Sequence, residues 1–126
     1  MTKENISLNR DIIELLRHLN NCLAKGDVRS FVFSIDWGKK HIKMPNNFED
    51  MLNELKNIGE HYLYWEHKFD IDKENGLHIP FDIDETKNTL FYYVIRKWKQ
   101  YRNAMEKYYD VNLHKEPDTE YLFPRG

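Results

Sequence analysis

One stretch decides the fold that the sequence predicts: residues 69–84 read FDIDKENGLHIPFDID, so that two copies of FDID flank a central Asn-Gly pair. Asn75-Gly76 is a strong signal for a two-residue β-turn, because both residue types tolerate the positive φ that such a turn requires. Pairing the two copies across this turn places Asp72 opposite Ile79. Pro80 then belongs at an edge or a bulge, because it has no N–H to donate to a ladder. The segment therefore predicts a β-hairpin.

The same segment is strongly acidic. Residues 60–85 contain eight Asp and Glu residues against two Lys residues, a net charge of −6. Carboxylates this crowded repel one another unless a cation or a basic partner compensates them. An EF-hand is ruled out, because Asn75 and Phe81 stand where its calcium loop needs Gly and Glu. We interpret the segment as a surface for a basic partner, and a charged hairpin edge that resists aggregation is the alternative. Its candidate contact residues are Asp70, Asp72, Glu74, Asp82, Asp84 and Glu85.

Hydrophobic periodicity predicts a long helix directly after this segment, over residues 85–109, with Val94, Trp98 and Met105 on its apolar face. The opposite face is basic, since residues 86–107 contain six Lys and Arg residues against one Glu, a net charge of +5. Basic groups interleaved with tyrosines suit contacts with phosphates, with bases or with the aromatic rings of a partner. A solvated helix face is the alternative. The candidate contact residues here are Tyr92, Tyr93, Arg96, Lys99 and Lys107.

A second hairpin is predicted nearer the N-terminus. Apolar and polar residues alternate over residues 30–37 (SFVFSIDW), which is the period of a half-buried strand. Residues 38–40 (GKK) supply a turn, and residues 41–44 return as a second strand that ends at Pro45. Trp37, beside several cations at the hairpin tip, is a candidate interface anchor, with a place in the core as the alternative.

Two further helices complete the predicted fold, over residues 8–25 and 48–67, each with apolar residues at steps of three and four. The order is α-ββ-α-ββ-α. It predicts an α+β fold in which helices pack on one face of an antiparallel sheet. We expect a small single domain over residues 1–111, followed by a C-terminal tail over residues 112–126.

Composition limits the class of protein. The chain has 126 residues, a mass of 15.4 kDa and a net charge of −2. We find no apolar run long enough to cross a bilayer and no secretory signal at the N-terminus, so we expect no membrane association. A single cysteine, Cys22, cannot form an internal disulfide; it falls near an apolar helix stripe and is expected in the core. These features predict a cytoplasmic protein.

Motifs for catalysis are missing from the sequence. We find no nucleophile elbow, Walker loop or dinucleotide glycine pattern, and the six histidines do not fall at zinc-ligand spacing. We therefore expect no enzyme activity, no cofactor and no metal. An enzyme with an acidic metal site is kept as a rival hypothesis, which predicts that divalent cations stabilise the fold against heat.

The functional hypothesis rests on surfaces. The chain is rich in Lys and Asn and has only two alanines, Ala24 and Ala104, which is typical of an AT-rich genome. In composition it resembles small accessory proteins of bacteriophages and mobile elements. Our first hypothesis is a non-catalytic protein-binding module, an inhibitor or antagonist of a host factor, that acts through the acidic hairpin and aromatic anchors. The alternative is a nucleic-acid-binding accessory or regulatory protein that uses the basic face of the last helix.

Overall fold

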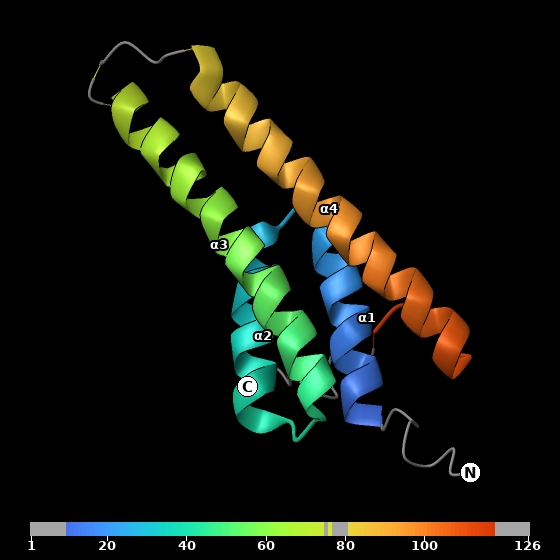
Figure 1. Cartoon of the computed structure of the whole chain (residues 1–126). Helices are drawn as coiled ribbons and strands as arrows, with labels where there is room; N and C mark the ends of the chain where they lie inside the picture. Colours follow the sequence, from blue (N-terminus) through green and yellow to red (C-terminus); the bar gives the residue numbers. More distant parts are fainter. Residues whose placement is uncertain (1–9, 75, 77–80, 118–126) are drawn as a thin grey trace.

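The computed structural model describes the backbone of residues 10–74, 76 and 81–117, and their side chains apart from those of residues 69–74 and 81–87. Four helices account for most of this part of the chain (Figure 1). They are α1 (Arg10–Ala24), α2 (Val28–His41), α3 (Asn46–Glu74) and α4 (Phe81–Tyr109). The described residues contain no strand, so the predicted α+β fold with an antiparallel sheet is wrong.

The first predicted hairpin is instead helix α2. Its buried residues recur at helical spacing and include Val28, Phe31, Ile35 and Gly38. Phe33, which a strand would place on the same face as Phe31, is 65% exposed. The alternation over residues 30–37 was therefore misleading, because the residues that the neighbouring helices bury follow a period of 3.6 and not of 2.

The second predicted hairpin, over residues 69–84, is also wrong. Its first half is the end of α3, which continues to Glu74, and its second half is the start of α4, which begins at Phe81. Gly76 between them does have a positive φ, of 71°. A residue with positive φ occurs at the C-terminal end of many helices as well as in β-turns. The Asn-Gly pair therefore did not distinguish a helix end from a hairpin.

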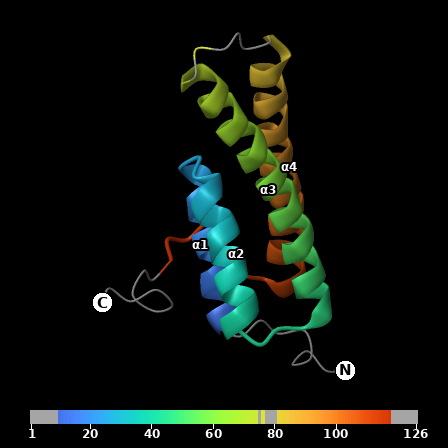
Figure 2. The ribbon, with the colours of Figure 1, turned by 90° about the vertical axis from the view of Figure 1, so that its left-hand side faces the viewer.

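The helices form two antiparallel pairs of unequal length (Figures 1 and 2). Consecutive helices are neighbours, with α1 against α2, α2 against α3, and α3 against α4. At a rise of about 1.5 Å per residue, the 29 residues of α3 and of α4 each span about 44 Å, whereas the 15 residues of α1 span about 22 Å. The far end of the α3–α4 pair consequently extends beyond the α1–α2 pair in both views.

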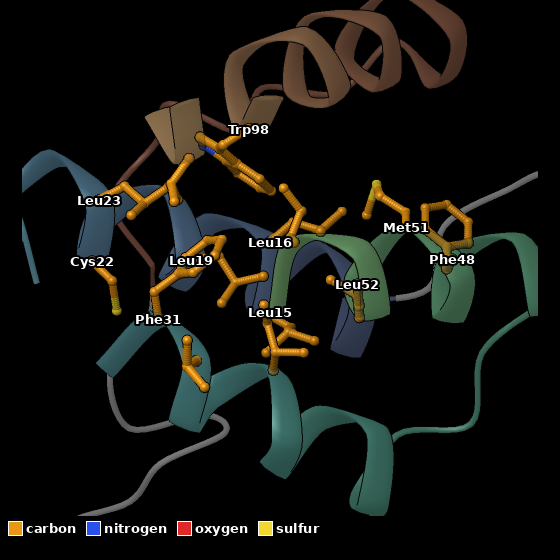
Figure 3. Close-up of a cluster of buried hydrophobic side chains, with 14 of the residues drawn as sticks. Leu15, Leu16, Leu19, Cys22, Leu23, Phe31, Phe48, Met51, Leu52 and Trp98 are labelled. Atoms are coloured by element: carbon orange, nitrogen blue, oxygen red, sulfur yellow. The ribbon is translucent and has the colours of Figure 1, made fainter. Parts of the chain in front are cut away.

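The core lies where all four helices overlap. Figure 3 shows Trp98 pointing from α4 into a cluster that includes Leu16 and Leu19 of α1. The Trp98 ring is 1% exposed and meets Phe31 of α2 edge-on, with ring centroids 6.1 Å apart. Its indole N–H donates to Asn20 Oδ1 at 2.8 Å. Trp98 therefore brings α4 to α1, which closes the bundle.

The chain folds back after α4. Leu113 is fully buried, and its backbone N–H donates to Glu106 Oε2 at 2.7 Å. The same carboxylate lies 2.9 Å from Nδ1 of His114. Burial raises the pKa of Glu106, but the hydrogen bonds from Leu113 and His114 outweigh it and hold the pKa below its ordinary value. Part of the predicted tail thus contributes to the core.

Candidate functional site

The outer side of α4 carries an exposed polar stripe, which we call the open face. Tyr92 is 68% exposed and Tyr93 is 38% exposed at its upper end. The exposed residues that follow share one side of the helix, because steps of three and four return to nearly the same angle. The open face consists of Tyr92, Tyr93, Arg96, Lys99, Gln100, Asn103 and Lys107.

The cations of the open face have no ionic partner among the described side chains. Arg96, Lys99 and Lys107 form no ion pair with any carboxylate whose side chain the structure describes. The guanidinium of Arg96 lies over the ring of Tyr93, 5.9 Å from its centroid, which is a cation–π contact. The sequence-predicted basic and aromatic residues of α4 are thus brought together on one accessible surface.

Lys97 has a different role from its neighbours, since it pairs with Glu54 of α3 at 3.1 Å. The hydroxyl of Tyr101 donates to the same carboxylate. The hydrogen bond from Tyr101, followed by that from Lys97, lowers the pKa of Glu54. This cluster joins α3 to α4 and takes one lysine out of the basic surface.

The acidic candidates lie at the far end of the long helix pair. The backbone of Asp70, Asp72 and Glu74 belongs to the last turns of α3, and that of Asp82, Asp84 and Glu85 to the first turn of α4. Their side chains lie outside the described residues. We call these six residues the acidic end.

Trp37 is not on the same helix as the tyrosines of the open face. It belongs to α2, is half-buried against the core, and stacks on His41 with ring centroids 4.6 Å apart. Trp37 thus packs partly against the core and is partly exposed, so its position fits neither the interface anchor alone nor the core residue alone.

Two of the hollows in the described part of the chain lie between α4 and another helix, and the sequence did not predict them. One is a groove of about 470 Å³ between the start of α3 and the end of α4, lined by Phe48, Met51 and Tyr108 among others. The other, of about 300 Å³, lies between α1 and α4. Tyr108 is 60% exposed where it lines the first hollow. The sequence carried no signal for either hollow, since each combines residues distant in the chain.

The described part of the chain assembles no metal-ligand cluster. No group of three His, Cys, Asp or Glu side chains converges there. Cys22 is buried in the core as expected, and burial raises the pKa of its thiol to about 11. No helix in the described ranges is both long and apolar enough to cross a bilayer.

Comparison with known proteins adds no family or fold relative: no protein-family model, curated protein or solved structure matches the chain. The function is therefore argued from the surfaces described above.

Proposed function

We propose that the protein is a non-catalytic protein-binding module that presents the acidic end of its α3–α4 pair to a basic partner. The observation that carries this proposal is the projection of the pair beyond α1 and α2 (Figures 1 and 2). A helix pair that extends past its bundle offers its end to a partner without rearrangement of the fold. In this proposal the protein acts as an inhibitor or antagonist of a host factor, and that factor is the basic partner.

Separation of charge along α4 supports the proposal. Asp84 and Arg96 are twelve positions apart on one helix, which corresponds to about 18 Å. Charges in water are screened over about 8 Å at physiological ionic strength. The acidic end and the open face therefore act as two separate fields, and the acidic end attracts a basic groove without cancellation by the cations of the open face.

Aromatic residues supply the anchor that charge alone does not provide. Charge complementarity raises association rates, whereas buried aromatic side chains carry much of the binding energy at interfaces. Tyr92, 68% exposed, lies eight positions after Asp84 and about 12 Å from it along α4. A partner that covers both would bury Tyr92 while it contacts the acidic end.

The test compares matched charge removals. Proteins recovered from the native host by the wild-type chain are identified by mass spectrometry, and the purified partner is then titrated with variants. Asp70→Asn with Asp82→Asn, and Asp72→Asn with Asp84→Asn, are expected to weaken binding about tenfold or more. The control pair, Asp50→Asn with Glu116→Gln, removes two exposed carboxylates elsewhere and is expected to leave the affinity unchanged. Equal effects of all three pairs would contradict a specific role of the acidic end.

A second candidate function is nucleic-acid binding through the open face. The specific observation is its length and accessibility: from Tyr92 to Lys107 it spans about 22 Å and presents cations without described carboxylate partners. Such a stripe suits several successive phosphates of one strand, with a base stacked on Tyr92.

Salt dependence tests this second candidate. We expect a fluorescent oligonucleotide to bind at low salt with a steep loss of affinity as salt rises. Arg96→Glu with Lys107→Glu is expected to abolish binding, whereas Lys40→Glu with Lys43→Glu, on exposed positions elsewhere, is the matched control. No binding of DNA or RNA at low salt would remove the candidate.

A further inference from the structure

The hollow between α1 and α4 combines an apolar floor with a cationic rim. It has a volume of about 300 Å³, at the lower end of the range of small-molecule sites. Leu23, Ala24, Ile95 and Trp98 form the apolar part of its lining, and Asn20, Lys99, Arg102 and His114 form the polar part. No carboxylate from the described part of the chain lines it.

Arg102 is held at the rim by neutral acceptors. Its Nη1 donates to Asn20 Oδ1 at 3.0 Å, and its Nε and Nη2 donate to Asn103 Oδ1 at 3.3 and 3.2 Å. Amide oxygens orient a guanidinium without cancelling its charge, as a carboxylate would do. Since a guanidinium has five N–H donors, two remain available beyond these described bonds.

Asn20 is itself fixed, because its Oδ1 also accepts the indole N–H of Trp98 at 2.8 Å. The position of Arg102 is therefore tied to the largest fully buried side chain of the core. A donor that is oriented before a ligand arrives loses less conformational entropy on binding.

Lys99 adds a further donor to the rim, and His114 lies beside it. Lys99 is exposed and has no described carboxylate partner. His114 is held through Nδ1 by Glu106 at 2.9 Å, which leaves its Nε2 for another contact. Glu106 interacts electrostatically with Arg102, which is one of the groups that lower its pKa, so this carboxylate offsets part of the positive charge of the rim. Lys99 and Arg102 together still leave the rim net positive. The rim consequently favours an anion.

We propose that this hollow binds a nucleotide unit, in which a phosphate is joined through a sugar to a flat base. The phosphate matches the donors of Lys99 and Arg102, and the base matches the apolar lining formed by Leu23, Ala24 and Ile95. Inorganic phosphate would leave the floor unfilled, and an apolar molecule would leave the cations without a partner. The proposal does not depend on the protein contact above, because no residue of the acidic end lines the hollow.

Isothermal titration calorimetry of the full chain tests the proposal with four probes: thymidine 5′-monophosphate, thymidine, inorganic phosphate and a short oligothymidylate. We expect the monophosphate to bind at least about tenfold more tightly than thymidine or phosphate. Tighter binding of the oligothymidylate than of the monophosphate identifies a strand as the source of the nucleotide, and equal binding per site identifies a free nucleotide. No saturable binding of the monophosphate at millimolar concentration overturns the proposal, as does equal affinity for inorganic phosphate.

Variants separate this site from a general effect of charge. Lys99→Gln and Arg102→Gln are each expected to weaken monophosphate binding about tenfold, and Ala24→Phe, which fills the hollow, to abolish it. Lys40→Gln is the control, since it removes one exposed positive charge on α2. Circular dichroism confirms folding, and Lys99→Gln keeps the test valid if Arg102→Gln unfolds, because Lys99 makes no described side-chain contact within the protein. An equal loss in Lys40→Gln would contradict the proposal.

Discussion

Two glycines inside helices determine how closely the helices of this protein approach. A Cβ at Gly38 of α2 would lie 2.5 Å from a methyl carbon of Leu15, and a Cβ at Gly59 of α3 would lie 2.7 Å from one of Val32. Glycine costs about 1 kcal/mol relative to alanine in a helix, so a sequence pattern counts it against one. Here the contact between helices explains both residues. The prediction of a turn at Gly38 did not include that contact.

The first prediction concerns Gly59. Gly59→Ala gains about 1 kcal/mol in helix propensity but overpacks the α2–α3 contact, which typically costs about 1–3 kcal/mol. We expect a net loss in the free energy of unfolding, measured by urea denaturation. The control makes Gly59→Ala in a Val32→Ala background, where the clashing methyl group is absent. In that background Gly59→Ala should raise the free energy of unfolding. The same loss in both backgrounds would mean that the Val32 contact is not the cause.

Individual helices begin and end where local chemistry directs them. α1 ends before Gly26, whose φ is 73°, and the N–H of Asp27 donates to the carbonyl of Cys22 at 2.9 Å. Asp27 then caps α2: its Oδ1 accepts the backbone N–H of Ser30 at 3.0 Å and its Oδ2 accepts the Ser30 hydroxyl at 2.7 Å. The sequence indicates the end of α1, because glycine, here Gly26, is common just after the last residue of a helix. The Asp27 cap was not used, because the segment after it was interpreted as a strand.

The second prediction follows from this cap. Asp27→Ala is expected to lower the free energy of unfolding by about 1 kcal/mol at neutral pH, and Ser30→Ala by less, because the backbone bond survives. The backbone hydrogen bond from Ser30, and then its hydroxyl, lower the pKa of Asp27 in the folded state below the ordinary value of 3.8. The stabilisation is thus present above about pH 4 and is lost as pH falls through the folded pKa. Chemical denaturation at neutral and acid pH should show the wild-type and Asp27→Ala values converge in acid; a constant difference would contradict the cap.

At the scale of the whole molecule, the contact between α1 and α4 depends mainly on one side chain, that of Trp98. The backbones of these two helices are not closely packed, unlike those of consecutive helices. Trp98 fills the space between them and reaches Phe31 on α2. Leu113 lies in the segment that follows α4, and its fully buried side chain covers the core. The bundle is therefore completed by contacts between distant residues. Asn20 and Trp98, for example, are 78 positions apart, and no local sequence pattern predicts that they meet.

The third prediction tests this closure. Trp98→Ala is expected to lower the free energy of unfolding by about 3–5 kcal/mol, as is typical for removal of a buried aromatic residue. Trp98→Phe keeps a ring but removes a donor to Asn20, so we expect a smaller loss, to which the missing hydrogen bond contributes about 1 kcal/mol. Urea denaturation followed by circular dichroism measures both. Equal losses in the two variants would show that the ring itself does not close the bundle.

The sequence by itself determined the helices α1 and α4, most of α3, the burial of Cys22, and the uneven distribution of charge along the chain. Each of these follows from residues within a few turns of one another, such as the stripe from Val94 to Met105. Only the tertiary structure decided that residues 30–41 belong to helix α2 and that residues 69–84 contain the ends of two long helices. The physical reason is that a short apolar run suits a strand or a helix equally, and burial by distant partners, as of Gly38 against Leu15, selects between them. The hollow beside Trp98 has the same origin, since Asn20 and Arg102 meet only once the bundle has closed.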